Sequence, residues 1–445
     1  MTNLLFLSIS LLYIGFASRV IFTLVRRGVI ISLVGGLHLN TLLSMGVGPL
    51  AYVLFPAAFD GERINHGLII ENALVPYGLS LIGYLVAFVA LVYSNRGARF
   101  SSLNTRLLEV SSFQMYMFFA LGLIGIAAIN ARVNESGLGT VFNVLYLFVF
   151  PLVSLAVFRA GDKSIAALVG AAIIVGGIGY YSLTSYWRSL SLLFAISLVI
   201  GLFMRHKFRP MLTLSLAVLS VAWYVWMFPF LQLKKSNAPS GLVEIFATFR
   251  ESQELSMADR LPVAFSFLGL RTNGAREIGY IETGLRNGVI DLRYGESYKE
   301  TILQLVPRVL WPSKPSFNLA MNYELPRAIG LLGSDDYETS SGVGLWAEAT
   351  WNLGPYFLMF YVPALFWTFG AIDRRVLSSR LDAFSKWLLA SCLFYLSLQV
   401  LNLVNFVTMV LWTIIVVSIY NKFLYAFLSG GRPVNLRLSK RARLG

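Results

Sequence analysis

Apolar runs long enough to cross a bilayer recur along almost the whole of this chain, and no other feature limits its fold as strongly. Each run covers about 17–25 residues, which as a helix spans the roughly 30 Å of a hydrocarbon core. Hydrophobic residues make up 57% of the chain and charged residues only 13%. A closed β-barrel needs short strands that alternate apolar and polar residues, whereas 211–231 is apolar on nearly every face. The sequence therefore predicts an all-α polytopic membrane protein.

The runs predict about eleven transmembrane helices, within a range of about 10–12. Their expected positions are 4–25, 29–56, 72–93, 113–130, 141–158, 165–183, 188–204, 211–231, 355–371, 385–402 and 405–427. The first run has no small-residue cleavage site and passes directly into Arg26 and Arg27, so we expect a retained span and not a removed signal peptide. The second run contains several glycines and Pro49, so we expect its helix to be kinked or broken.

Short connections rich in Lys and Arg alternate with connections that hold few of them, and positive charge is retained on the cytoplasmic side. This bias predicts an external N-terminus, a cytoplasmic C-terminus and one large external loop. The expected regions are the N-terminal spans in 1–231, the loop in 232–353, the C-terminal spans in 354–427 and a basic tail in 428–445. The net charge of +14 is mostly this orientation signal. Because the basic residues are dispersed, nucleic acid is not an expected partner, whereas anionic membrane lipid suits the tail.

The external loop has the composition of a folded segment, since apolar and aromatic residues persist between its charges. The spacing predicts an amphipathic helix over 242–255 and a second helix over 296–306, with Ile302, Leu303 and Leu305 on its apolar side. Several prolines after 306 predict an extended, rigid path. The single cysteine, Cys392, lies in an apolar span, so packing on the membrane helices must hold the loop.

The absence of several sequence motifs argues against some classes of reaction. No Walker-type glycine loop is present, so direct use of ATP is not expected. Histidine occurs only at 38, 66 and 206, none of them in the loop, which argues against a His-based metal site and against a Ser-His-Asp hydrolase there. We therefore expect neither a metal nor another cofactor.

The loop is rich in charges of both signs, with twelve basic residues from Lys234 to Arg327 and fourteen acidic residues from Glu244 to Glu348. Eight of the twelve are arginine, whose forked side chain binds phosphate and carboxylate groups bidentately. The candidate anion ligands are Arg271, Arg276, Arg286, Arg293, Arg308, Arg327 and Lys314. The alternative for each is a solvated or salt-bridged loop surface.

Aromatic residues beside these charges, such as Trp311, Tyr323 and Trp351, are suited to stacking on sugar rings, although ordinary cores and membrane interfaces also use them. Glu348 is the expected general base because it lies just before the ninth span, where the loop re-enters the membrane. The alternative for Glu348 is an acid favoured by the dipole at the N-terminus of a helix.

Two motifs carry a resemblance to a known family. The string Val306-Pro-Arg-x-x-Trp-Pro-x-Lys-Pro315, followed by Glu348-Ala-x-x-Asn352-x-Gly354 at the start of a helix, resembles the oligosaccharide repeat unit polymerases, the Wzy-type O-antigen polymerases of bacteria. The large external loop late in a chain of about a dozen helices is similar as well. A motif of some members, a loop arginine followed by ten residues and a glycine, is not found at the loop arginines of this chain.

The resemblance implies a metal-independent membrane glycosyltransferase, similar in plan to GT-C-type enzymes, in the bacterial inner membrane with its loop in the periplasm. It implies transfer of a glycan from undecaprenyl diphosphate to another lipid-linked repeat unit, with a Wzz-type chain-length regulator and a Wzx-type flippase as partners. Transferred to this chain, it implies that Glu348 and Arg308 are catalytic. Binding of the diphosphate falls to Arg308, Lys314, Arg271, Arg276 and Arg293, and binding of the glycan to Trp311, Tyr323, Trp351 and Asn352.

Two other functions remain open from the sequence. An O-antigen ligase would resemble this architecture, but by resemblance its large loop carries a functional histidine, which this loop lacks. A flippase or transporter of the lipid-linked sugar would be expected to place charged residues along a route through the spans, and these spans hold few.

Overall fold

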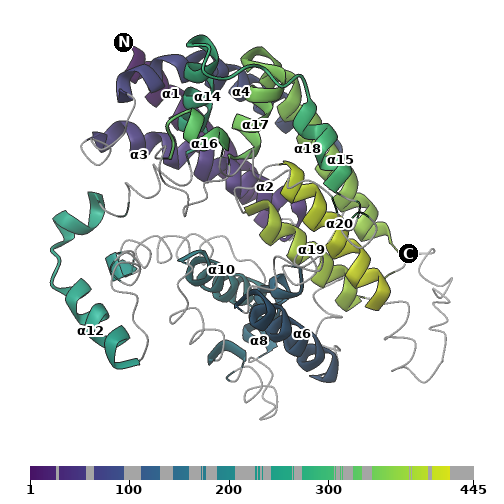
Figure 1. The fold of residues 1–445 in the computed structure, drawn as a ribbon. Coiled ribbons are helices and arrows are strands. Elements are labelled where there is room, and N and C mark those ends of the chain that lie inside the picture. Colours follow the sequence, from purple (N-terminus) through teal and green to yellow (C-terminus); the bar gives the residue numbers. More distant parts are fainter. Residues whose placement is uncertain are drawn as a thin grey trace.

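The structure is a computed structural model. It describes residues 1–26, 30–56, 65–94, 112–130, 144–159, 172, 174–176, 188–205, 226–227, 229–230, 233, 242–262, 264, 273–304, 306, 311, 313, 324–332, 343–379, 381, 383–398 and 403–420. Within these residues the chain forms helices and no strand, as the all-α prediction requires (Figure 1). Among the described residues, four helices are long and apolar enough to cross a membrane, namely Thr2–Arg26, Leu33–Leu54, His66–Val89 and Pro355–Val376.

The N-terminal helices are α1 (Thr2–Arg26), α2 (Leu33–Thr41), the π-helix η1 (Leu42–Val47), α3 (Gly48–Leu54), α4 (His66–Ser94), α6 (Ser112–Asn130), α8 (Val149–Arg159) and α10 (Arg188–Arg205). The later helices are α12 (Leu242–Gln253), α14 (Gly274–Arg286), α15 (Glu296–Gln304), α16 (Leu325–Ala328), α17 (Leu345–Leu353), the 3₁₀ turn η5 (Pro355–Phe357), α18 (Leu358–Ser378), α19 (Ala383–Leu398) and α20 (Leu403–Ile419). The expected spans 165–183 and 211–231 lie largely outside the described residues, and 405–427 does so beyond residue 420.

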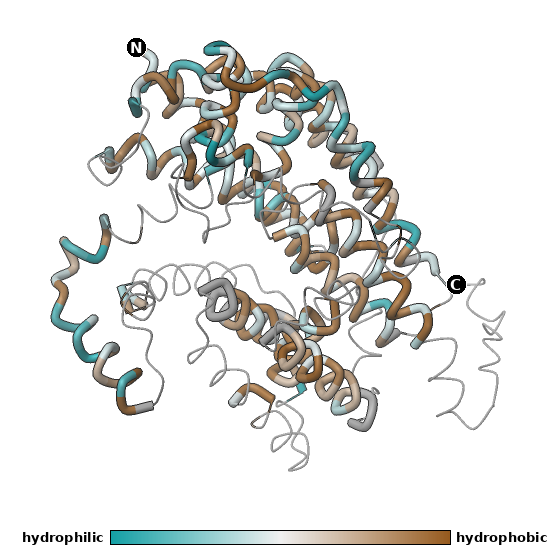
Figure 2. The backbone as a smooth tube through the Cα atoms, viewed as in Figure 1, coloured by the Kyte–Doolittle hydropathy of each residue, from teal (hydrophilic) through white to brown (hydrophobic). Residues whose placement is uncertain are grey.

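Large apolar side chains are exposed along several of the long helices. Leu4 of α1 is 67% exposed, Val75 of α4 is 50% exposed and Trp367 of α18 is 67% exposed. Figure 2 shows that hydrophobic residues dominate these helices and also α19 and α20. Apolar surface on this scale is stable against lipid and not against water, which agrees with a helical membrane protein.

The second predicted span is interrupted, as its glycines and proline indicated. α2 passes through the π-helical turn η1 into α3. The Tyr77 hydroxyl of α4 donates a hydrogen bond to the Met45 carbonyl oxygen within that turn, and its oxygen lies 3.1 Å from the Ser10 hydroxyl oxygen of α1. Irregular backbone at membrane depth needs such partners, because lipid offers none.

Small residues let the helices of this core approach closely. A Cβ atom at Gly36 of α2 would lie 2.0 Å from Ser397 Oγ of α19. A Cβ atom at Gly279 of α14 would lie 2.5 Å from the carbonyl oxygen of Ile69 in α4. The second contact fixes a loop helix on a membrane helix, so the loop is held by packing on the membrane helices, as expected for a chain without disulfides.

Two span boundaries were predicted too short. The helix α4 starts at His66, six positions before the predicted start, and these extra turns pack against α14. The helix α18 runs to Ser378, seven positions past the predicted end, and so contains Asp373. Both carboxylate oxygens of Asp373 accept backbone hydrogen bonds at the start of α2, from Leu33 and Val34 at 2.9 Å each. Asp373 therefore caps a neighbouring helix, which explains why a charged residue lies within a long apolar helix.

Candidate functional site

The helix α17, which carries Glu348, receives its N-terminal cap from a residue distant in the sequence. The residue before the helix is Gly344, which has no side chain to cap it. Glu277 of α14 supplies the missing group, because its Oε2 atom accepts a hydrogen bond from the Gly344 N–H at 2.9 Å. At the other end, Gly354 has a φ of +83°, a backbone conformation that strongly favours glycine, and Pro355 follows it. These two glycines therefore define the extent of α17.

Glu348 is completely buried, and three helices meet at its carboxylate. The Ser297 hydroxyl of α15 donates to Glu348 Oε1 at 2.7 Å, and the Leu403 N–H at the start of α20 donates to Oε2. Asn352, one turn further along α17, donates from Nδ2 to Ser297 Oγ at 2.7 Å. Its Oδ1 atom accepts from the Ser297 N–H at 3.2 Å. Ser297 is therefore held on both sides, so its hydroxyl proton points at Glu348.

The surroundings of Glu348 raise the pKa of its carboxyl group toward neutral pH. Burial raises the pKa of Glu348 to about 7, against the hydrogen bonds from Leu403 and Ser297, which favour the ionised form. The aromatic rings of Tyr298 and Tyr361 stack beside this group with centroids 6.5 Å apart. Burial, and next the charge of Glu348, raise the pKa of Tyr298 above its ordinary value. A carboxyl group with a pKa near 7 is suited to accepting or releasing a proton at neutral pH.

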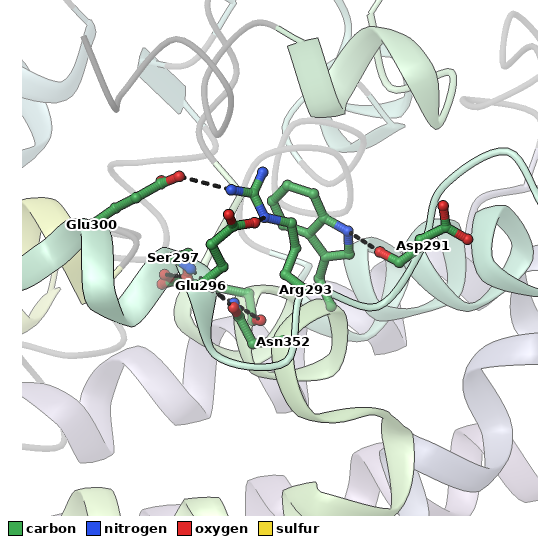
Figure 3. A network of polar contacts seen from close by, with 8 residues as sticks. Asp291, Arg293, Glu296, Ser297, Glu300 and Asn352 are labelled. Atoms are coloured by element: carbon green, nitrogen blue, oxygen red, sulfur yellow. Dashed lines mark hydrogen bonds and ion pairs between the residues drawn. The ribbon is translucent and has the colours of Figure 1, made fainter. Parts of the chain in front are cut away.

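Arg293 forms a second polar cluster next to this one (Figure 3). Its Nε atom lies 2.9 Å from Glu296 Oε2, and its NH2 nitrogen lies 2.7 Å from Glu300 Oε1. Its guanidinium carbon lies 4.9 Å from the centroid of the Trp351 ring. The indole N–H of Trp351 in turn donates to the Asp291 carbonyl oxygen at 3.0 Å. The two clusters share α15 and α17, because Arg293 precedes α15 and Trp351 belongs to α17.

Arg276 lies in α14, on the side of the site that Glu277 connects to α17. The Asn273 side chain caps α14 by accepting from the Arg276 N–H at 2.9 Å. The Arg276 side chain is largely buried and lies over the Tyr280 ring, 4.9 Å from its centroid. Burial raises the pKa of Glu277 to about 7, against the hydrogen bond from Gly344 and the charge of Arg276.

A cavity of about 10 Å³, close to the size of one water molecule, lies between α14 and the π-helical region. Its lining includes Asn40, Ser44, Glu277 and Trp346. This lining brings the buried carboxylate of Glu277 next to polar side chains of the interrupted second span.

The structure describes six of the ten predicted site residues. It brings Glu348, Asn352, Trp351 and Arg293 together around α15 and α17, and it places Arg276 on the adjoining α14. Trp311 is half-buried. Four predicted ligands lie outside the described residues: Arg308, Lys314, Arg271 and Tyr323. Arg293 already forms ion pairs with two glutamates, so an incoming diphosphate would have to compete with them.

Sequence reasoning missed Ser297 and Glu277, because for α15 it singled out only the apolar side. The predicted apolar side of that helix included Ile302, which is 67% exposed, whereas Ser297 is completely buried. Ser297 is buried where it hydrogen-bonds to Glu348 and Asn352, which lie 51 and 55 residues later in the chain. No local pattern reports partners at that distance, so periodicity alone favoured the apolar residues.

Within the described part of the chain, no group of three or more His, Cys, Asp or Glu side chains is arranged to hold a metal ion. Comparison of the chain with known protein families, with curated proteins and with solved structures finds no match.

Proposed function

We propose that this protein polymerises lipid-linked oligosaccharides by glycosyl transfer, with Glu348 as the general base. The observation that carries the proposal is a fully buried carboxylate with a pKa of about 7, which already accepts a hydrogen bond from a hydroxyl group at 2.7 Å. This carboxylate lies where two loop helices meet the start of an apolar helix. The resemblance of the motifs around residues 306–315 and 348–354 supports the same class of reaction.

In the proposed reaction, the hydroxyl oxygen of an acceptor sugar attacks the anomeric carbon of the donor glycan. The bond from that carbon to the diphosphate oxygen breaks, and the diphosphate of the undecaprenyl carrier leaves with the bonding electrons. The hydroxyl proton passes to Glu348. The acceptor hydroxyl would replace the Ser297 hydroxyl as the hydrogen-bond donor to Glu348 Oε1, since that position already suits an O–H group. The donor is already activated, so the reaction consumes no nucleotide.

Cationic side chains are assigned to the leaving diphosphate, where negative charge develops. Arg276 is the described candidate that lies on the helix docked against α17. Arg308, Lys314 and Arg271 are assigned this role through the family resemblance. Trp351 and Asn352 are reassigned as positioning residues, because Asn352 holds Ser297 and Trp351 lies under Arg293.

By this proposal the protein lies in the bacterial inner membrane with the Glu348 side facing the periplasm, and it works with a flippase and a chain-length regulator. The test is a polymerisation assay with purified protein and an undecaprenyl-diphosphate-linked repeat unit, with products resolved on a gel. Wild type should give a ladder, and Glu348→Gln should leave the single repeat unit. The control is Glu282→Gln on α14, a largely buried glutamate paired with Arg286, which should keep the ladder.

A ladder of normal length from Glu348→Gln would remove Glu348 from catalysis. Transfer of finished glycan to a lipid core, without chain extension, would replace the polymerase with a ligase. Unchanged substrate that appears only on the opposite side of a vesicle would replace it with a flippase.

A further inference from the structure

An open apolar groove of about 840 Å³ runs between α18 and α20 on the membrane-spanning part of the protein. Its walls are formed mainly by Leu365, Phe369, Ile372, Val410 and Ile414. Within a bilayer, hydrocarbon chains fill such a groove, because its lining offers few polar groups. We therefore expect a lipid chain to occupy the groove, and the side chains at its two ends indicate which class of lipid binds.

The two helices run in the same direction from the candidate site. The helix α18 follows α17 through the short turn η5, and α20 begins at Leu403, whose N–H binds Glu348. Tyr361 and Leu403 therefore line the end of the groove near the candidate site, and Arg375 lines the opposite end. Fourteen helical positions separate Tyr361 from Arg375, which is about 21 Å at 1.5 Å per residue.

The far end of the groove carries the positive charge of Arg375, whereas the nearest acidic residue in the sequence, Asp373, caps α2. Arg375 is exposed, and within the described part of the chain its side chain has no hydrogen bond or ion pair. Ser379 and Ser418 line the same groove near the C-terminal ends of α18 and α20. A cation beside hydroxyl groups, at the polar end of an apolar groove between membrane helices, is the chemistry that binds a lipid phosphate.

We propose that this groove binds an anionic phospholipid of the cytoplasmic leaflet, with its phosphate at Arg375 and one acyl chain along Ile372, Phe369 and Leu365. An acyl chain reaches about half of the 30 Å hydrocarbon thickness, so it fills the portion of the groove nearest to Arg375. The Lys and Arg distribution predicts that this end is cytoplasmic, where anionic lipids are concentrated. The site is independent of the proposed glycosyl transfer.

Two other occupants fit the charges less well. A diphosphate-linked carrier that reacts near Glu348 would place its anionic group at the Tyr361 end, where none of the described residues that line the groove is a cation. The segment after Tyr420 contains many basic residues, from Lys422 to Arg443, and like charge at Arg375 opposes its docking there. An anionic lipid headgroup, by contrast, complements Arg375 directly.

The test is thermal unfolding of the purified full-length protein in a mild zwitterionic detergent, with added dioleoylphosphatidylglycerol or dioleoylphosphatidylcholine as probes. Phosphatidylglycerol should raise the Tm of wild type in a saturable way, and phosphatidylcholine should not. Arg375→Gln should raise the half-saturating phosphatidylglycerol concentration about fivefold, the typical contribution of one arginine at a lipid surface. The matched control is Arg374→Gln, which removes the same charge from the adjacent position outside the groove.

A second variant tests the apolar part of the site. Ile414→Trp fills the groove without changing any charge, and it should weaken phosphatidylglycerol binding while Arg375 remains. Equal shifts with both lipids, or equal losses in the Arg374 and Arg375 variants, would overturn the proposal. Recovery of a polyprenyl lipid in place of phospholipid from protein purified directly from membranes, identified by mass spectrometry, would also overturn it and assign the groove to the carrier.

Discussion

The Ser297 hydroxyl donates a hydrogen bond of 2.7 Å to the carboxylate of Glu348, 51 residues later in the chain, and both residues are completely buried. Ser297 thereby connects α15 to α17, and through the Leu403 N–H the same carboxylate also reaches α20. One glutamate thus holds three helices together and is also the group we propose for proton transfer. The predictions below separate these two roles.

Ser297→Ala should destabilise the protein by about 1–3 kcal/mol, because it leaves a buried amide donor of Asn352 and a buried carboxylate oxygen of Glu348 without their partner. Thermal unfolding in detergent measures the loss. Ser8→Ala is the control, since Ser8 is exposed and its hydroxyl donates to the Leu4 carbonyl oxygen one turn earlier in the same helix, and it should change the Tm little. Equal effects from the two substitutions would contradict the role of Ser297 at the helix junction.

The stability of the fold should depend on pH through Glu348. Its pKa is raised from 4.5 to about 7 by burial, so the folded state binds a proton more tightly than the unfolded chain. The stabilisation from this proton is complete below about pH 4.5 and is lost as the pH rises through about 7. Glu348→Gln, which cannot ionise, should show a smaller fall in Tm than wild type between pH 5 and pH 8. The pKa of Glu277 is also raised by burial, but Glu277 is present in both proteins. The difference between the two curves of Tm against pH therefore reports the effect of Glu348.

The rate of polymerisation should rise with pH through about 7, because the proposed base must first lose its proton. Initial rates at saturating substrate, measured from pH 5.5 to 8.5, test this limb. Ser297→Ala removes a hydrogen bond that favours the ionised carboxylate, so its profile should shift to higher pH. A profile in Ser297→Ala that matches wild type would argue that Ser297 acts on the fold alone.

Gly279→Ala should weaken the attachment of the loop to the membrane helices. The added Cβ atom would lie 2.5 Å from the Ile69 carbonyl oxygen and 3.1 Å from Ala73 Cβ, both in α4, so the two helices must separate. We expect a loss of about 1–3 kcal/mol in the free energy of unfolding. Gly15→Ala in α1 is the control, since a Cβ atom there meets nothing within 4 Å. Limited proteolysis of the loop in both variants provides a second measurement, and increased cleavage is expected only for Gly279→Ala.

Trp351→Phe should test the support beneath Arg293. Phenylalanine keeps an aromatic face for the guanidinium but removes the indole N–H that donates to the Asp291 carbonyl oxygen. The expected cost is about 1 kcal/mol from the lost hydrogen bond. Trp351→Leu removes the cation–π contact as well and should cost about 0.5–1 kcal/mol more. Equal stability of the Phe and Leu variants, measured by thermal unfolding, would show that the ring face contributes nothing.

The apolar runs determined the class of fold, since each run has to be helical wherever lipid surrounds it. They located α1, α6 and α10 within two residues of their ends in the structure. They also indicated the interruption of the second span, where Gly46 and Pro49 flank the junction between η1 and α3. The motif around Glu348 selected a residue that the structure buries at the meeting point of three helices. These features depend on composition and local spacing, which a single sequence contains.

The tertiary structure alone decided which groups complete the site. Ser297 lies on a helix whose pattern favoured the face of Ile302, and Glu277 caps a helix that begins 68 residues later, at Leu345. Asp373, within an apolar helix, caps α2 across the core. In each case a buried polar group had to find a partner, and the partner was set by packing between helices distant in the chain. Hydrophobic periodicity records how much of a helix is buried, whereas only the assembled helices determine which polar groups meet there.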